Sequence, residues 1–158
     1  MSKMLVTYFS ATGTTRRLAE TMAAALGADI AEIVPAEIYT NADLNWRDSG
    51  SRSTLEMRDE ASRPLLDSAI DVAPYDTVFV GFPIWWGIAP RIVETFLEST
   101  SFSGKTIVAF ATSGGSGMGR TVDVLKKSAP DARFLNGRLM RASESEKSIR
   151  KWVDSLDI

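Results

Sequence analysis

The sequence predicts an α/β fold of three layers, in which helices cover both faces of a five-stranded parallel sheet. Short runs rich in Val, Ile and Phe alternate along the chain with stretches whose apolar residues recur at helical spacing. The connections between these runs are too long for hairpins, so right-handed crossovers would join the strands in parallel. With 158 residues the chain is long enough for an ample core. We therefore expect residues 1–158 to form a single domain.

Five stretches are expected to form the strands. Four of them are mostly apolar, as is typical of strands buried on both faces: Met4–Phe9, Ile30–Val34, Thr77–Phe82 and Thr106–Ala111. The fifth, Ala132–Leu135, follows Pro130 and Asp131 and is expected to be interrupted at Asn136-Gly137.

Four amphipathic helices are expected between and after these strands, each with one apolar face for the core. The first ends at Gly27, a typical C-terminal cap, and the last opens with a Ser143/Glu146 capping box. The predicted ranges are Thr15–Leu26, Pro90–Glu98, Arg120–Lys127 and Ser143–Leu156.

The segment Pro35–Pro64 departs from this alternation, because loops of such length in compact domains are usually functional or disordered. It carries large apolar residues among ten charged ones. Two alternatives stay open, namely an ordered excursion over the sheet edge or partial disorder. In the ordered case, Ser53 and Glu56 could cap a short helix.

The composition excludes several classes of chemistry. The chain has no Cys and no His, which removes disulfides, thiol nucleophiles, imidazole bases and most zinc or copper sites. We predict neither a metal site nor a catalytic residue. A net charge of -2 does not provide the basic surface that nucleic acid requires. The run Met4–Phe9 is too short for a membrane span or a signal peptide, so we expect a soluble cytoplasmic protein.

The turn after the first strand has the composition of an anion site. Its residues Ser10–Thr15 place four hydroxyl groups around a single Gly at the start of a helix. The first N–H groups of a helix lack intrahelical partners, and the helix dipole adds partial positive charge there. An ordinary N-cap needs one such hydroxyl rather than four. The turn is therefore predicted to bind a phosphate group without a cation.

Two further turns could contact a ligand, one through aromatic side chains and the other through its backbone. The turn Gly81–Pro90 contains the adjacent residues Trp85 and Trp86, and each indole carries about 200 Å² of largely apolar surface. One of the two is expected to pack in the core, because adjacent side chains rarely point the same way. The turn Thr112–Gly119 has four glycines, which let backbone amides approach a ligand closely.

Common nucleotide-binding loops do not fit this pattern. Arg120 stands where the dinucleotide fingerprint needs a small residue after Gly115 and Gly117, and the Gly-Lys-Ser/Thr of a triphosphate loop is missing. Open parallel sheets bind ligands beyond the carboxyl ends of their strands, so the three turns are expected to meet. A turn that binds phosphate, a turn with an aromatic surface and a glycine-rich turn whose backbone amides can approach a ligand together fit flavin mononucleotide (FMN).

The sequence resembles the flavodoxin family, and within it the short single-domain members, over almost the whole chain. The resemblance rests on residues 8–15 (YFSATGTT), 43–48 (DLNWRD), 51–53 (SRS), 83–91 (PIWWGIAPR), 102–105 (FSGK) and 112–117 (TSGGSG). It implies a sheet of order 2-1-3-4-5 and non-covalently bound FMN at the switch between strands one and three.

The same resemblance implies three groups of cofactor-binding residues. The phosphate would be held by Ser10, Ala11, Thr12, Gly13, Thr14 and Thr15. The isoalloxazine ring, with either tryptophan stacked on one face, would be flanked by Pro83, Ile84, Trp85, Trp86 and Gly87. The polar edge of the ring would meet Thr112, Ser113, Gly114, Gly115, Ser116 and Gly117.

Two functional hypotheses follow from this resemblance. The first is a low-potential electron-transfer protein, a monomer or weak dimer, which exchanges electrons with redox partner proteins. The alternative is an NAD(P)H-dependent FMN oxidoreductase that reduces quinones or nitroaromatics, with residues 35–64 building its second pocket. A flavin-binding scaffold without redox turnover also stays open. A phosphorylated signalling receiver is rejected, because Phe9-Ser10 and Phe82-Pro83 stand where it needs acidic residues for magnesium.

Overall fold

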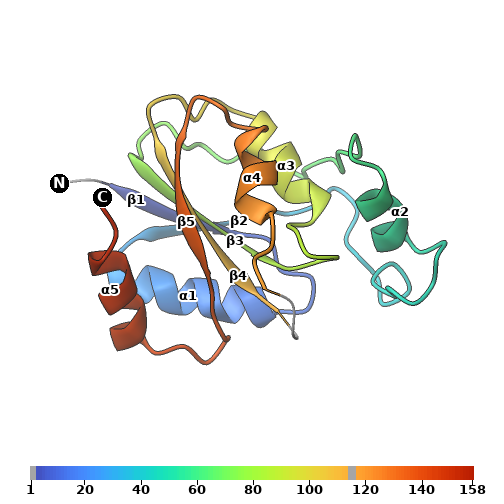
Figure 1. The fold of residues 1–158 in the computed structure, drawn as a ribbon, viewed down its shortest axis with the longest axis horizontal. Helices are drawn as coiled ribbons and strands as arrows, with labels where there is room; N and C mark the ends of the chain where they lie inside the picture. The colour runs from blue at the N-terminus through green and yellow to red at the C-terminus, as the bar shows by residue number, and fades with distance from the viewer. Residues whose placement is uncertain (1–2, 114–116) are drawn as a thin grey trace.

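The computed structural model describes residues 3–113 and 117–158. Within these ranges it shows a parallel sheet of five strands in the order β2-β1-β3-β4-β5, which confirms the predicted fold class and strand order (Figure 1). The carboxyl ends of the strands therefore share one edge of the sheet. The strands are β1 (Met4–Tyr8), β2 (Asp29–Glu32), β3 (Thr77–Pro83), β4 (Thr106–Thr112) and β5 (Arg133–Leu139).

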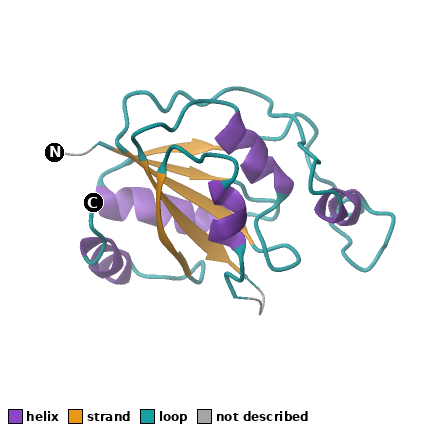
Figure 2. Cartoon of the chain, turned by 45° about the horizontal axis from the view of Figure 1, so that its top comes forward, coloured by secondary structure: helices purple, strands orange, loops and turns teal. Residues whose placement is uncertain are grey.

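Helices cover both faces of this sheet (Figures 1 and 2). Helices α1 and α5 pack together against one face, whereas α3 and α4 lie against the other. Helix α2 stands apart from both layers, beyond α3. None of the helices in the described ranges is long and apolar enough to cross a membrane. Their bounds are α1 (Thr14–Leu26), α2 (Arg52–Arg58), α3 (Arg91–Glu98), α4 (Thr121–Lys126) and α5 (Glu146–Asp154).

Side chains of the central strands point alternately into two cores. In β1, Leu5 joins the core under α3 and α4, and Val6 joins the core under α1 and α5. The same alternation occurs in β4, where the successive residues Ile107 and Val108 are buried on opposite faces. Burial on both faces explains why these strands are continuously apolar in the sequence.

Strand β2 is less buried than predicted. It lies at the edge of the sheet and, among the described strands, pairs with β1 alone. Ile30 is 42% exposed, and Asp29 beside it is exposed as well. The apolar run in the sequence predicts a strand but does not show whether that strand is central or peripheral.

The fifth strand is longer than predicted, because it continues through Asn136 and Gly137, where the sequence suggests an interruption. The pairing register with β4 shifts between Val108 and Phe110, so a local irregularity accommodates the strand. A Cβ atom on Gly137 would come within 2.7 Å of the Ala109 carbonyl oxygen. Because glycine has no side chain, the strand can continue at this point.

The predicted capping box of the last helix is wrong. Helix α5 begins at Glu146, and the Oγ atom of its N-cap Ser145 accepts a hydrogen bond from the Ser148 backbone N–H at 3.1 Å. The chain at Ser143 still forms a turn before the helix. Other helix and strand ends differ from the predicted ones by one or two residues.

Residues 35–64 agree with the ordered one of the two alternatives, because they fold into α2 and well-defined turns. The N-cap of α2 is Ser51, whose Oγ accepts a hydrogen bond from the Thr54 backbone N–H at 3.4 Å. The predicted cap, Ser53, instead lies inside the helix and is buried. A serine two residues earlier in the chain thus starts the helix.

We expect Gly137→Ala to destabilise the fold by about 1–3 kcal/mol, because the new Cβ would overlap a backbone carbonyl that is fixed within the sheet. Urea unfolding followed by circular dichroism measures the loss. Gly50→Ala is the matched control, since the nearest atom to its added Cβ is an Asp48 side-chain oxygen at 3.6 Å. Equal stabilities of the two variants would contradict the close approach at Gly137.

Candidate functional site

The β1–α1 turn presents polar groups at the carboxyl edge of the sheet. Gly13 has a φ of +94°, a left-handed conformation that leads the chain directly into α1. The Oγ of Ser10 accepts a hydrogen bond from the Gly13 backbone N–H at 3.0 Å, which holds the turn closed. The exposed hydroxyls of Thr12 and Thr14 lie 3.5 Å apart. Together with the N–H groups of the first helical turn, they form a donor-rich surface.

Thr15 occupies a different place from the other hydroxyl residues of this turn. It is 1% exposed, and its Oγ1 lies 2.8 Å from the Oγ1 of Thr112 at the end of β4. This buried pair joins two turns that are 97 residues apart in the sequence. The expectation that all four hydroxyls face an anion is therefore corrected. The Thr15 hydroxyl instead links the β1–α1 turn to the end of β4.

The β3–α3 turn holds its two tryptophans in different environments. Two backbone hydrogen bonds between Trp85 and Ile88, at 2.8 and 3.2 Å, close a two-residue turn. Trp86 and Gly87 form its tip with φ angles of +50° and +82°. Trp86 is 51% exposed, and its left-handed backbone is unusual for a bulky residue. Trp85 is half-buried, so the expected division between a packed and an exposed indole is confirmed.

The β4–α4 turn lies against the β3–α3 turn. The Thr121 hydroxyl donates a hydrogen bond to the Gly87 carbonyl oxygen at 3.4 Å. A Cβ atom on Gly119 would come within 2.7 Å of the same oxygen. Gly117 is exposed. Three of the predicted cofactor-binding residues lie outside the described residues, namely Gly114, Gly115 and Ser116.

A cavity of about 410 Å³ lies where the three turns meet. Its lining combines hydroxyl residues with apolar residues of the β3–α3 turn. The predicted residues that line it are Thr12, Thr14, Pro83, Ile84, Trp85, Thr112 and Ser113. The structure thus brings residues from all three predicted turns to one place.

Three lining residues of this cavity were missed by the sequence analysis. Met140, Arg141 and Ala142 follow β5 and complete the wall of the cavity. Their position was hidden because the fifth strand was predicted to stop before Asn136. A longer strand would have carried the following residues to the edge where the other strands end.

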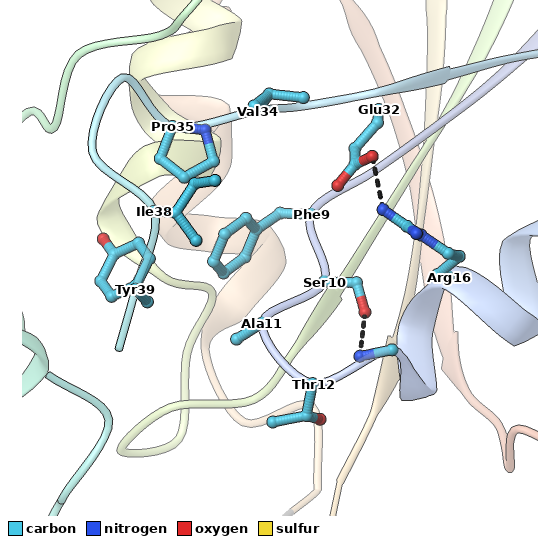
Figure 3. Close-up of a pocket in the computed structure, with 11 residues that line it drawn as sticks. Phe9, Ser10, Ala11, Thr12, Arg16, Glu32, Val34, Pro35, Ile38 and Tyr39 are labelled. Atoms are coloured by element: carbon cyan, nitrogen blue, oxygen red, sulfur yellow. Dashed lines mark hydrogen bonds and ion pairs between the residues drawn. The ribbon is translucent and has the colours of Figure 1, made fainter. Parts of the chain in front are cut away.

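A second cavity, of about 490 Å³, is lined by the turn residues Ser10–Gly13 (Figure 3). Phe9 and apolar residues of the segment after β2 form part of its wall. An ion pair between the Arg16 guanidinium and the Glu32 carboxylate, at 2.7 Å, forms the polar part. A cation therefore lies beside the turn, which the sequence analysis did not predict, and Glu32 balances its charge.

Tyr39 links the aromatic wall to the segment that carries α2. Its ring makes edge contacts with Phe9 and Trp85, with ring centres 5.6 and 5.4 Å apart. Its hydroxyl donates a hydrogen bond to Glu56 at 2.5 Å, and the Arg52 guanidinium lies 3.8 Å from the ring centre. Burial and the Glu56 carboxylate raise the pKa of Tyr39 above its ordinary value of 10.0. Tyr39, held by Glu56, thus helps to hold the Trp85 ring in place.

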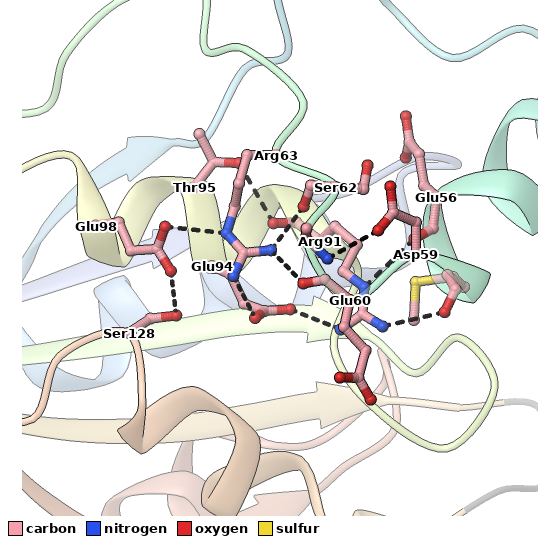
Figure 4. A network of polar contacts seen from close by, with 12 residues as sticks. Glu56, Asp59, Glu60, Ser62, Arg63, Arg91, Glu94, Thr95, Glu98 and Ser128 are labelled. Atoms are coloured by element: carbon pink, nitrogen blue, oxygen red, sulfur yellow. Dashed lines mark hydrogen bonds and ion pairs between the residues drawn. The ribbon is translucent and has the colours of Figure 1, made fainter.

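A network of ion pairs holds residues 35–64, the α2 segment, on α3 (Figure 4). The buried Arg91 guanidinium pairs with Glu94 at 2.9 Å and donates a hydrogen bond to the Met57 carbonyl at 3.0 Å. Arg63 lies 3.1 Å from Glu94 and 2.9 Å from Glu98. The Arg63 hydrogen bond lowers the pKa of the Glu98 carboxyl. Loss of one partner would leave a buried charge unpaired, so the network fixes the segment firmly.

A comparison with protein families matches residues 3–156 to the family described as Flavodoxin. The chain belongs to the flavodoxin family. A search of curated proteins gives no match.

Solved structures are consistent with flavodoxin membership. The chain is 51% identical to a proposed flavoprotein from Bacteroides eggerthii DSM 20697, covering 100% of this chain and 99% of that one, with a TM-score of 0.95. A proposed flavoprotein from Bacteroides uniformis ATCC 8492 is 46% identical, with 98% and 99% coverage and a TM-score of 0.92. A flavoprotein from Lactobacillus acidophilus NCFM in complex with FMN shares the fold at 19% identity, with 97% and 99% coverage and a TM-score of 0.68.

Removal of the Tyr39 hydroxyl should weaken this flavodoxin-family protein and flatten its alkaline stability profile. Tyr39→Phe removes the donor of Glu56 Oε1 and leaves Arg52 as the partner of Oε2, and we expect a loss of about 1–2 kcal/mol near neutral pH. The folded pKa of Tyr39 lies above the unfolded one, so its contribution is complete below about pH 10 and is lost as the pH rises further. Urea unfolding at about pH 8 and about pH 11 measures both effects.

Wild type should therefore lose more stability than Tyr39→Phe between these two pH values. Tyr75→Phe serves as the comparison, because its hydroxyl is bonded to the exposed Asp29 at 2.6 Å, which raises the pKa of Tyr75 by less than burial and Glu56 raise that of Tyr39. It should therefore flatten the pH slope less than Tyr39→Phe does. Identical pH slopes for wild type and Tyr39→Phe would show that the Tyr39 hydroxyl is not held as described.

Proposed function

We propose that this protein binds FMN where the three turns meet and acts as a cytoplasmic, low-potential electron-transfer protein. The observation that carries this proposal is the cavity of about 410 Å³, whose walls combine the hydroxyls of the β1–α1 turn with the aromatic β3–α3 turn. Its size is within the range typical of small-molecule sites. Flavodoxin membership and the FMN complex of the Lactobacillus acidophilus neighbour support the choice of cofactor.

In this proposal the FMN phosphate lies at the start of α1. The donors for it are the hydroxyls of Thr12 and Thr14 and the backbone N–H groups of Thr14 and Thr15. Ser10, Ala11 and Gly13 give the turn its shape, through the left-handed glycine and the hydrogen bond to the Ser10 hydroxyl. These donors are all neutral.

The isoalloxazine ring lies between the β3–α3 and β4–α4 turns. Trp85 lines the cavity, but its ring is already packed against Phe9 and Tyr39. We therefore assign the stacking contact to Trp86, whose exposed indole lies at the tip of the same turn. Trp86 is half exposed and held in a strained conformation, which is common at ligand-binding positions. The polar edge of the ring is assigned to the backbone of residues 112–117, and Pro83, Ile84 and Gly87 complete the opposite side.

Bound FMN supplies the redox chemistry by accepting and releasing electrons. The residues of this chain hold the cofactor, exclude water from one side of it and set the energy of its charged forms. Pro83, Ile84 and Met140 surround the cavity with apolar groups, which disfavour additional negative charge and so lower the potential. Redox partner proteins then exchange electrons at the exposed side, with the chain as a monomer or weak dimer.

A second candidate function is an NAD(P)H-dependent FMN oxidoreductase that reduces quinones or nitroaromatics. The observation that favours it is the cavity of about 490 Å³ beside the β1–α1 turn (Figure 3). Pro35, Ile38 and Tyr39 contribute to its walls, as expected if the segment after β2 builds a pocket for a second flat molecule.

Reconstitution and reduction of the purified protein test these functions in turn. Titration with FMN should give the absorption spectrum of a bound flavin at one equivalent per chain. A protein that takes up no FMN would refute the proposal. A carrier should be reduced readily by dithionite and only slowly by NADPH. Rapid NADPH oxidation in the presence of a quinone would favour the oxidoreductase instead.

Trp86→Ala should raise the Kd for FMN about tenfold or more, because a stacked ring is worth roughly 1.4 kcal/mol or more in such a site. The apoprotein should keep its unfolding midpoint, since Trp86 is half exposed. Quenching of flavin fluorescence measures the Kd.

Trp46→Ala is the matched control for this experiment, because Trp46 is 65% exposed and lies outside the three turns of the proposed site. Its FMN affinity should equal that of wild type. The same Kd for Trp86→Ala and Trp46→Ala would show that Trp86 does not stack on the ring.

A further inference from the structure

One arginine at the proposed FMN site has no part in the assignments above. Arg141 follows β5 and lines the cavity of about 410 Å³ together with Thr12 and Thr14 of the β1–α1 turn. Its side chain is exposed. A long, cationic side chain thus borders the same cavity as the hydroxyls assigned to the phosphate.

The fold fixes the backbone of Arg141 from both sides. The Met140 backbone N–H donates a hydrogen bond to the Ala111 carbonyl at 2.8 Å, which extends the contact with β4 beyond the end of β5. The Arg141 carbonyl accepts a hydrogen bond from the Glu144 backbone N–H at 3.0 Å, in the turn that leads to α5. Because α1 and α5 pack on the same face of the sheet, this turn stays near the start of α1.

Arg141 differs in its charge balance from Arg16, the other arginine beside the turn. Arg16 is paired with Glu32 at 2.7 Å, so a carboxylate already compensates its charge. The Arg141 guanidinium has no ion-pair partner within residues 3–113 and 117–158. The turn itself, Ser10–Thr15, carries no charged side chain. Arg141 therefore brings an uncompensated positive charge to the side of the cavity where the turn offers only neutral donors.

We propose that Arg141 binds the FMN phosphate and makes the site select FMN over riboflavin, which lacks the phosphate. This proposal rests on the FMN site argued above. A guanidinium presents several N–H donors in a planar fork that matches phosphate oxygens. The neutral donors of the turn hold the phosphate by hydrogen bonds, and Arg141 adds an attraction that salt weakens.

The affinities of the full-length protein for FMN and riboflavin test this proposal, measured by flavin fluorescence. In Arg141→Gln the Kd for FMN should rise about fivefold to tenfold at low salt, as expected for a partly exposed charge-assisted pair. The Kd for riboflavin should change by less than about twofold. In ~1 M salt, where the Debye length is about 3 Å, wild type and variant should bind FMN more nearly alike.

Arg138→Gln is the matched control, because it removes the same charge from β5, three residues before Arg141. The Arg138 guanidinium lies 5.9 Å from the Trp152 ring centre, and Arg138 does not line the cavity. Its affinity for FMN should equal that of wild type. Arg141→Lys restores the charge but not the planar fork, so it should recover only part of the affinity for FMN.

Any of four results would overturn the assignment of Arg141. Equal losses of FMN and riboflavin affinity in Arg141→Gln would show that the side chain only packs the cavity, and unchanged values for both flavins would show that it has no contact. A wild-type protein that binds riboflavin as tightly as FMN would also contradict it. A wild-type protein that binds neither flavin would refute the proposed function and this inference together.

Discussion

The buried hydrogen bond between Thr15 and Thr112 is the contact on which the site depends. Neither hydroxyl can turn to water for another partner, because both residues are almost fully buried. The parallel sheet places the β1–α1 and β4–α4 turns at the same edge, and this bond fixes the distance between them. The first turn of α1 is thereby held at the cavity that Thr112 also lines. The Thr15–Thr112 hydrogen bond thus holds the N–H groups at the start of α1 beside the cavity.

The α2 segment gives the aromatic side of the pocket a comparable support. Arg91 and Glu94 anchor this segment to α3, and its Glu56 holds the hydroxyl of Tyr39. Tyr39 in turn packs against Trp85, at the base of the two-residue turn that exposes Trp86. A turn is usually the mobile part of a site, whereas here residues behind it restrict its movement. The segment that breaks the regular alternation of strands and helices thus supports the pocket.

The sequence predicted the sheet and the meeting of the three turns because both follow from local patterns. Apolar runs, helix periodicity and glycine-rich or hydroxyl-rich turns are visible without knowledge of distant contacts. The role of Thr15 was not visible, because four neighbouring hydroxyls look alike until one of them meets a partner 97 residues away. The interruption predicted at Gly137 was wrong for a related reason. The glycine is needed because Ala109 approaches closely, and Ala109 lies in another strand. Arg141 was missed as a consequence, since its place depends on where β5 ends.

The central claim is that one FMN molecule spans the start of α1 and the β3–α3 turn, with its phosphate at the helix. Amide and indole NMR spectra recorded during titration with FMN and then with riboflavin test this claim most directly. The account predicts that FMN shifts the backbone amides of residues 12–16 and the indole signal of Trp86 together, and that riboflavin shifts the indole signal but leaves the amides nearly unchanged. Shifts confined to another surface, or amide shifts of equal size with both flavins, would contradict it.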